Sequence, residues 1–281
     1  MLIDHADAFS NRPIAPFPVD FDAGRRISHS INIVPYGSLW RALRCNLTAG
    51  ILHPSRLGLL APLQRDAAEG VVGSLSARCA AGEVVVDLRD SLHTAVFTLA
   101  ARLCFGDSVS VRRRQVCAMQ DALREFFADL VEARGLAASK LARLLHWRRW
   151  QRFGSTFDRL IGLFLPLIAE RQLRRSRCGD GSGGSIIRRP YVDSLLDLQV
   201  PDDAQDGARR ALTDYEMASL VWEFLGAGTE TVVSCVEWTL AHLAAQPDVQ
   251  EKLHRELTAG DGAVASEARV RAWGWCRGRG R

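Results

Sequence analysis

The chain has 281 residues, of which 47% are hydrophobic and 24% are charged, and its formal net charge is +4. These values are ordinary for a soluble globular protein, and the length suffices for a large domain with a sizeable core. The five arginines from Arg269 onward account for the positive balance, so nothing indicates a nucleic-acid groove and we expect no nucleic-acid partner.

The cysteines and the N-terminal residues indicate the cellular compartment in which the protein is expected. The seven cysteines include no C-x-x-C pair and no zinc-like spacing, which favours reduced thiols and predicts no metal cluster. Met1–Asp7 lacks the basic and apolar regions of a targeting peptide. The longest apolar run, Leu160–Ala169, is shorter than the roughly 20 residues of a membrane span. We therefore predict no anchor in this chain, and a cytoplasmic location if it is expressed.

The first half of the chain predicts helices separated by short turns. Asp87 is typical of a helix N-cap, and Gly82 and Gly106 are typical helix ends. Cys104, just before Gly106, is expected to be a small core residue. The predicted helices are Pro62–Ala81, Asp87–Phe105, Arg112–Glu132 and Ser139–Arg175, the last interrupted near Gly154 and Pro166.

Trp40 and Arg44 lie four residues apart, within Tyr36–Arg44, and so share one face of a predicted helix. Indole offers a lone donor, and guanidinium is a permanent cation suited to carboxylates. The two side chains together fit an anionic ligand group. From this pair alone, a surface helix with an inward Trp and a solvated Arg is the favoured interpretation. A short turn at His53–Arg56 follows.

Residues 174–189 form a Gly/Ser/Arg stretch without periodicity, which predicts a flexible linker. Its glycines match G-x-G-x-x-G formally, but no strand precedes them, so the dinucleotide interpretation fails. Tyr191–Val200 predicts a short helix, Pro201–Asp206 an acidic loop, and Pro247 the start of another helix.

The organising element is the run from Thr213 to Gln246. Thr213 and Glu216 form the T-x-x-E pattern of a capping box. No proline interrupts the run, so one helix of about 32 residues and ~50 Å is expected. Its apolar segment Met217–Gly228 predicts a helix buried within a domain.

Gly226 and Gly228 lie inside this helix, where each glycine costs about 1 kcal/mol relative to alanine. Either close helix packing or the approach of a flat ligand would explain them. A buried Thr hydroxyl in the segment Gly226–Thr231 can bond back to a carbonyl one turn earlier and bend the helix, which would open space beside the backbone.

Glu216, Glu223, Glu230 and Glu237 recur every seven residues on the same helix. Such a stripe is usually a solvated face. Small or apolar neighbours of Glu230 favour a crevice instead, and the residues alone leave both interpretations open.

Ala227-Gly228-Thr229-Glu230-Thr231 resembles the (A/G)-G-x-(D/E)-T signature of the haem-thiolate monooxygenases, the cytochromes P-450. The W-x-x-x-R pair and the order of the surrounding helices resemble the plant microsomal members. The resemblance implies a mainly α fold, the helical middle portion of that family's fold, with little or no β-sheet. On this basis residues 1–267 form an incomplete domain and residues 268–281 a disordered tail outside it.

The resemblance also implies a function: dioxygen activation and oxygen insertion into an apolar small molecule. Haem is the expected cofactor, with Trp40, Arg44, Ala227 and Gly228 as its contacts. Glu230 and Thr231 are the expected catalytic residues, which manage protons. An NADPH-fed cytochrome reductase is the expected partner, and the cytosolic face of the endoplasmic reticulum membrane is the location of intact relatives.

The E-x-x-R helix and the loop with the iron-binding cysteine of that family are not found in this sequence. Cys276 lacks the required context, so we assign no metal ligand and expect the axial cysteine to be absent. The chain is therefore predicted to be a truncated, inactive fragment of a monooxygenase. A haem-free helical remnant that binds a small molecule or a protein, or a pseudogene product, is the alternative.

Overall fold

The computed structural model describes residues 30–82, 87–106, 113–137, 140–178, 189–202 and 207–258. The predictions for residues 1–18, for the 268–281 tail and for most of the 174–189 linker lie outside these ranges. Two compact units divide the chain, residues 1–232 and residues 233–281, and each is described by itself.

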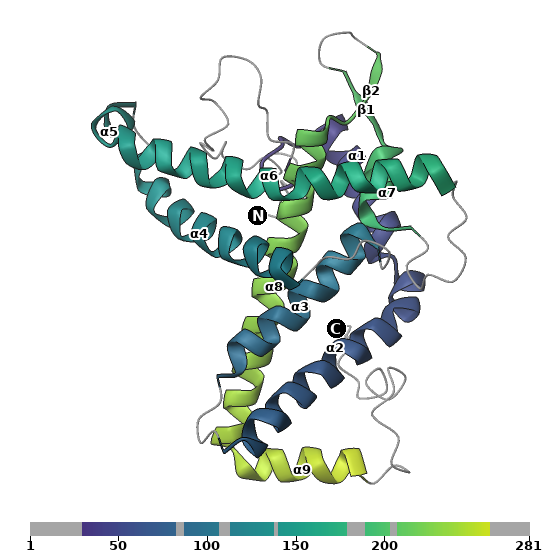
Figure 1. Ribbon diagram of the computed structural model, residues 1–281, viewed down its shortest axis with the longest axis vertical. Helices are drawn as coiled ribbons and strands as arrows, with labels where there is room; N and C mark the ends of the chain where they lie inside the picture. The colour runs from purple at the N-terminus through teal and green to yellow at the C-terminus, as the bar shows by residue number, and fades with distance from the viewer. Residues whose placement is uncertain are drawn as a thin grey trace, which may run out of the picture. The chain divides into compact units, whose positions relative to one another are not determined.

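The described elements are almost wholly helical, as the sequence predicts (Figure 1). In the first unit α4 packs beside α6, and α2 packs beside α3. The sheet consists of two short antiparallel strands. The elements are α1 (Ser38–Leu47), the π-helical turn η2 (Thr48–Leu52), α2 (Pro54–Ala80), α3 (Leu88–Phe105), α4 (Arg113–Ala137), α5 (Lys140–Leu145), α6 (Trp147–Cys178), α7 (Tyr191–Leu196), β1 (Gln199–Pro201), β2 (Arg209–Ala211), α8 (Asp214–Ala245) and α9 (Pro247–Thr258).

Helix α8 confirms the prediction of one 32-residue helix. The capping box is formed: the Thr213 amide donates to Glu216 Oε2 at 2.8 Å, and the Glu216 amide donates to Thr213 Oγ1 at 3.3 Å. The segment from Glu216 to Glu223 is buried throughout. Two orphan backbone donors are thus satisfied at the end of α8 that enters the core.

Helix α3 also begins and ends where its sequence predicts. Asp87 Oδ1 accepts a hydrogen bond from the Arg89 amide at 2.8 Å. Gly106 follows the helix with φ +84°, a backbone conformation that residues other than glycine rarely adopt. Cys104 is fully buried in the core, as expected.

The boundaries of α2 and α6 correct two predictions. Helix α2 begins at Pro54 rather than Pro62, so the predicted His53–Arg56 turn is reduced to His53. Helix α6 runs unbroken through Gly154 and Pro166, and the break lies earlier, at His146. Pro166 and Gly162 are both exposed, so water can satisfy the Gly162 carbonyl that loses its helical partner.

Two further predictions change around α7. Arg174–Cys178 belongs to α6 rather than to a linker, because Arg174 pairs with Glu170 and Arg175 with Asp197. Helix α7 stops at Leu196, and the residues expected to continue it form β1. Gln199, Val200 and Pro201 pair there with Ala211, Arg210 and Arg209 of β2.

An aromatic cluster joins α4, α6 and α8 in the core of the first unit. The Phe126 ring centroid lies 5.4 Å from Phe153, 5.5 Å from Phe157 and 5.0 Å from Trp222. Phe126 and Phe153 are almost completely buried. Such offset and edge-on aromatic contacts add to the free energy gained by burying the rings.

The second unit contains the end of α8 and helix α9. Pro247 opens α9 as predicted, at a position where a missing N–H has no helical partner to lose. The amides of Val249 and Gln250 both donate to the Gln246 carbonyl at 3.1 Å. Within the described residues, no helix has both the length and the hydrophobicity that a membrane span requires.

The carboxylates of α8 do not form the solvated face that was one interpretation of their spacing. Glu216 and Glu223 are buried, with 6% and 8% of their surface exposed. Glu216 pairs with Arg210 of β2 at 2.7 Å. Glu223 accepts hydrogen bonds from the amides of Ile31 and Asn32, both at 2.8 Å. These contacts fix β2 and the segment before α1 to the same helix.

We predict that Glu223→Gln lowers the free energy of unfolding by about 1–3 kcal/mol. An amide has one acceptor oxygen, so either the Ile31 or the Asn32 amide would face an NH₂ group. Hydrogen exchange should show faster exchange of these two amides. Glu132→Gln, at an exposed site on α4, is the control. Equal effects of the two variants would contradict the prediction.

Candidate functional site

The predicted haem-facing residues of α8 form a strip beside open space. Ala227 and Thr231 are exposed and Gly228 is half-buried. Apart from its chain neighbours and the adjacent helix backbone, no heavy atom of the described residues lies within 4 Å of a Cβ atom placed on Gly228. Val232, the next residue, is 44% exposed. This strip of small side chains and one hydroxyl can accept a flat group against the helix.

Gly226 has a different reason to be glycine. A Cβ atom there would lie 2.9 Å from Phe127 Cζ and 3.2 Å from Phe127 Cε2. Residues two apart on a helix point about 200° apart, so Gly226 and Gly228 face different surroundings. Close packing explains Gly226, and it does not explain Gly228.

Thr231 Oγ1 donates to the Ala227 carbonyl at 2.7 Å, which confirms the predicted back-bond. The expected distortion is absent, because α8 is α-helical throughout and the π-helical turn of the described chain lies at Thr48–Leu52. The Thr231 hydroxyl thus uses its proton within the helix and keeps its lone pairs for an outside donor. Thr229 is buried, and its hydroxyl has no partner among the described residues.

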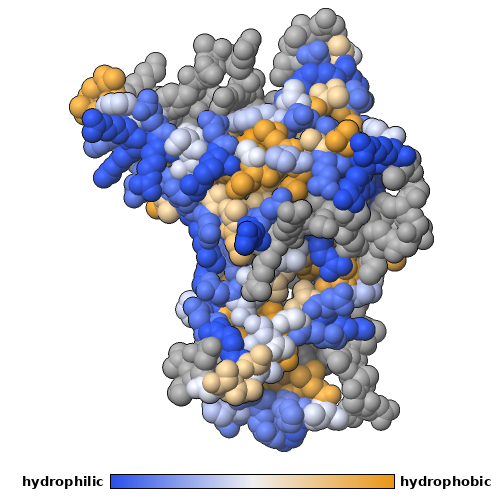
Figure 2. All heavy atoms as spheres, viewed as in Figure 1, coloured by the Kyte–Doolittle hydropathy of each residue, from blue (hydrophilic) through white to orange (hydrophobic). Residues whose placement is uncertain are grey.

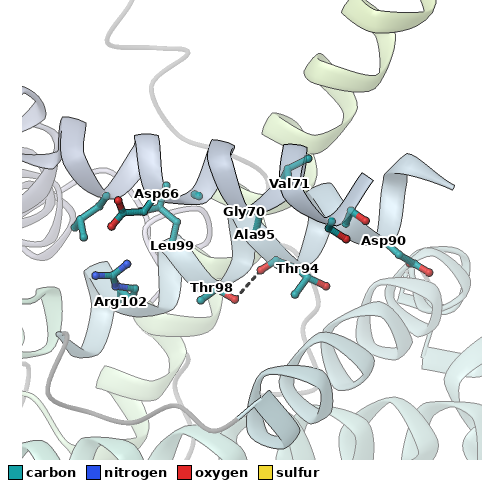
Figure 3. A pocket seen from close by; sticks show the side chains of 13 residues that line it. Asp66, Gly70, Val71, Asp90, Thr94, Ala95, Thr98, Leu99 and Arg102 are labelled. Atoms are coloured by element: carbon teal, nitrogen blue, oxygen red, sulfur yellow. Dashed lines mark hydrogen bonds between the residues drawn. The ribbon is translucent and has the colours of Figure 1, made fainter. Parts of the chain in front are cut away.

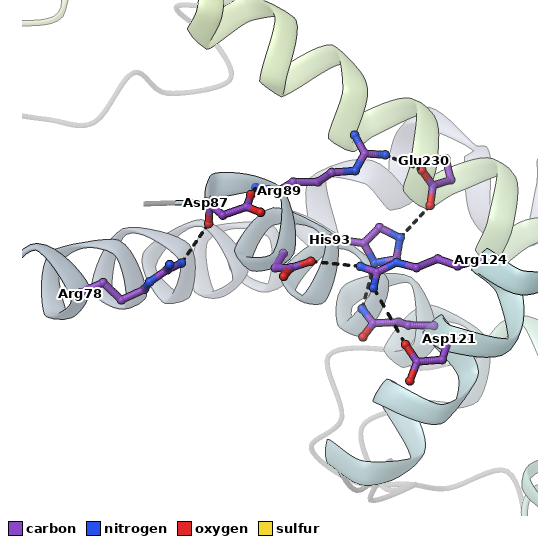
Figure 4. A network of polar contacts seen from close by, with 9 residues as sticks. Arg78, Asp87, Arg89, His93, Asp121, Arg124 and Glu230 are labelled. Carbon is purple, nitrogen blue, oxygen red and sulfur yellow. Dashed lines mark hydrogen bonds and ion pairs between the residues drawn. The ribbon is translucent and has the colours of Figure 1, made fainter. Parts of the chain in front are cut away.

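Glu230 points away from the strip toward α3, where two side chains hold its carboxylate (Figure 4). Glu230 Oε1 lies 2.8 Å from His93 Nε2, and Oε2 lies 3.1 Å from Arg89 Nη2. The Glu230 side chain is 35% exposed and that of His93 only 3%. The carboxylate therefore has one buried partner and one partner at the solvent boundary.

Sequence reasoning did not identify His93, Arg89 or Gln120, which binds the far side of His93. Arg89 and His93 are four apart on α3, on the face toward Glu230. That spacing is a usable signal, but it names no partner, since Glu230 is 137 residues from His93.

Trp40 and Arg44 both lie on α1, as predicted. Trp40 is half-buried, with its ring centroid 5.3 Å from that of Tyr36. Arg44 is exposed, and no carboxylate of the described residues lies within ion-pair distance of it. Among the described residues, no hydrogen bond or ion pair joins this pair to Ala227–Thr231. An exposed guanidinium without an internal carboxylate fits an anionic group of a ligand, such as a haem propionate.

A groove of about 580 Å³ lies between α2 and α3 (Figure 3). Asp66, Asp90, Thr94, Thr98 and Arg102 are among its lining residues. None of the predicted site residues lines it, so it gives no support to the candidate site.

Comparison with known proteins places these residues in a family. The family model for cytochrome P450 matches residues 1–265. The chain belongs to the cytochrome P450 family. It is 28% identical over 258 residues to cytochrome P450 89A9 of Arabidopsis thaliana, a match that covers 91% of this chain and 48% of the relative.

Other relatives of this P450 chain agree. It is 32% identical to cytochrome P450 78A7 of Arabidopsis thaliana, over 84% of the chain and 42% of the relative. A zebra fish cytochrome P450 structure with progesterone has a TM-score of 0.62 at 20% identity, covering 93% of this chain and 55% of that one. The structural likeness confirms a helical partial P450 fold. The chain spans about half the length of the curated relatives it matches.

The cysteines in the described part of this P450 chain offer no clustered metal site. Cys104 is buried between helices, and burial raises the pKa of its thiol well above the ordinary value, so it stays a neutral core residue. Cys45, Cys79, Cys117 and Cys235 are exposed. No group of three metal-ligating side chains occurs among the described residues, and Cys276 lies outside them.

The two glycines give a matched test of the strip. Both alanine variants gain helix propensity, about 1 kcal/mol each, but only Gly226→Ala must displace the Phe127 ring. We expect Gly228→Ala to be more stable than Gly226→Ala by about 1–3 kcal/mol. Urea unfolding of both variants measures the difference. Equal stabilities would show that Gly226 has room for a methyl group.

Proposed function

We propose that this chain is the oxygen-side portion of a haem-dependent monooxygenase that inserts oxygen into an apolar small molecule. The observation that carries the proposal is the open strip Ala227–Gly228–Thr231 beside a carboxylate held by α3. Membership of the cytochrome P450 family supports the reaction class. Its relative named germacrene A hydroxylase, from Lactuca sativa, supports a small apolar substrate.

Haem, when bound, supplies dioxygen activation. Trp40 and Arg44 would donate to a propionate from α1. Gly228 and Ala227 would let the flat group lie against α8, since no side chain there exceeds a methyl group. The Thr231 hydroxyl oxygen would accept a hydrogen bond from a donor outside the helix through its lone pairs. Glu230, 35% exposed, would exchange protons with solvent and pass them toward the strip.

The finer parts of the proposal concern the chain alone and its partners. We propose that the 281-residue chain alone, to which no further segment adds a thiolate, binds haem weakly. It would not catalyse the monooxygenase reaction. Electrons would come from an NADPH-fed cytochrome reductase. The second candidate function is that of a haem-free helical protein that binds a small molecule or a protein. Measuring haem binding to the purified chain separates the two candidates.

Haem titration of the purified chain tests the role of Arg44. We expect Arg44→Leu to weaken haem binding about tenfold or more, because a hydrogen bond to a charged group contributes about 1.5–3 kcal/mol. Arg41→Leu is the matched control, since Arg41 lies one turn earlier on α1 and stacks over Tyr36 at 5.0 Å. Quenching of tryptophan fluorescence gives both affinities.

If the two variants weaken haem binding equally, Arg44 does not have the proposed role in binding haem. The reduced chain with carbon monoxide gives a second readout. We expect a haem spectrum without the band typical of a thiolate ligand. A thiolate band would contradict the proposed inactivity, and the absence of any haem binding would favour the haem-free role.

We also propose that the protein works at a membrane surface, as relatives of the plant microsomal type do. The segment from α5 into α6 exposes Leu141, Leu144, Leu145 and Trp147, with 64%, 71%, 70% and 50% of their surface accessible. Figure 2 shows hydrophobic atoms gathered over α5 with hydrophilic residues beside them. The exposed Arg148 stacks on Trp147 at 5.6 Å. Leucines and a Trp next to arginines are typical of an interface with anionic lipid.

Vesicle sedimentation tests this surface. We expect the chain to bind phosphatidylcholine vesicles that contain phosphatidylserine, and Leu144→Glu/Leu145→Glu to lower the binding about tenfold or more, because both leucines would lose their burial in lipid. Leu173→Glu, at a site on α6 that is 58% exposed, is the control. A similar loss in the control would show that the effect is not specific to α5.

A further inference from the structure

His93 is a buried imidazole whose two nitrogens are both engaged. Nε2 lies 2.8 Å from Glu230 Oε1, and Nδ1 lies 3.1 Å from Gln120 Nε2 on α4. The ring stacks on Phe97, with centroids 6.3 Å apart and planes at 10°. Only 3% of the His93 side chain is exposed. The imidazole is thus fixed on three sides by α3, α4 and α8.

The partner at Nδ1 decides the tautomer. The Gln120 amide is oriented with its nitrogen toward Nδ1, and an amide nitrogen can only donate, so this orientation makes Nδ1 an acceptor. The single ring proton of a neutral imidazole then lies on Nε2, from which it is donated to the Glu230 carboxylate. Each ring nitrogen of His93 then has a complementary partner: Nε2 donates to Glu230, and Nδ1 accepts from Gln120.

The charged groups around the ring divide between two sides. Arg89 binds the other carboxylate oxygen of Glu230, at the solvent boundary. Arg124 of α4 pairs with Asp90 at 3.3 Å and with Asp121 at 3.9 Å (Figure 4). The positive charge of Arg124 is thus directed to two carboxylates of its own, and Glu230 is the acid that contacts the imidazole directly.

We propose that His93 is a positioning residue for Glu230: a neutral imidazole, held as the Nε2–H tautomer by Gln120, that fixes the carboxylate from its buried side. The importance of this for proton handling rests on the proposed function; the contact itself does not.

A direction for proton movement follows. The Gln120 amide can neither take up nor release a proton at neutral pH, so it closes the buried end of the chain of hydrogen bonds. Protons reach Glu230 through its exposed edge beside Arg89. His93 holds the acid, and it is not the entrance of a relay.

Long-range proton–nitrogen NMR of the haem-free chain, labelled with ¹⁵N-histidine, tests the tautomer. The His93 signals are assigned by their loss in His93→Gln. We expect Nδ1 to show the shift of an unprotonated nitrogen and Nε2 that of a protonated one, at neutral pH. In Gln120→Leu the two tautomers should mix. A protonated Nδ1 in the unmodified chain would overturn the proposal.

A double-mutant cycle tests the positioning. We expect His93→Phe and Glu230→Gln to be non-additive by about tenfold in the unfolding equilibrium constant, because each removes the same charge-assisted hydrogen bond. His93→Gln keeps a donor near the Nε2 position and should retain most of the coupling with Glu230. Additive effects, or no rescue by glutamine, would overturn the proposal.

Both measurements are made without haem. If the chain binds no haem in the titration, the proposed function is wrong and the His93 contact is unaffected. A wrong tautomer or an additive cycle would remove the His93 contact and leave the proposed function standing.

Discussion

Three buried or half-buried carboxylates on one stripe of α8 hold the first unit of this chain together. Glu216 binds β2, Glu223 binds the backbone before α1, and Glu230 binds α3. A carboxylate taken out of water costs several kcal/mol unless it is charge-paired or fully hydrogen-bonded. Each of these partners is therefore bound at a fixed position along α8. Rotation of the helix about its axis would break all three contacts.

This constraint determines what the rest of the helix presents. With the stripe facing its partners, Gly226 is turned against Phe127, while Ala227, Gly228 and Thr231 occupy the surface on the other side of Glu230. The strip makes few contacts of its own, so the anchored stripe defines its position. A functional surface keeps its geometry when packing and hydrogen bonds on rigid elements hold it in place.

Local rules in the sequence predicted most helix boundaries. The capping box at Thr213, the cap at Asp87 and the start at Pro247 each depend on residues within one turn, and all three are confirmed. The seven-residue spacing of the glutamates was equally compatible with a solvated face, because the partners lie far away in sequence. The strands β1 and β2 have three residues each, too few for an alternating pattern. The break at His146 has neither Gly nor Pro to mark it.

The open space beside Gly228 has a different cause from the one the sequence suggested. A back-bonding threonine predicted a distorted helix, but the back-bond of Thr231 forms at 2.7 Å and α8 stays α-helical. Space exists there because position 228 lacks a side chain, Ala227 has only a methyl group, and no other element in the described part of the chain comes within 4 Å of a Cβ placed on Gly228. No strained backbone has to be maintained. Access to the strip thus depends on the size of a few side chains, while its orientation depends on the contacts that the carboxylates of α8 make with β2, α3 and the segment before α1.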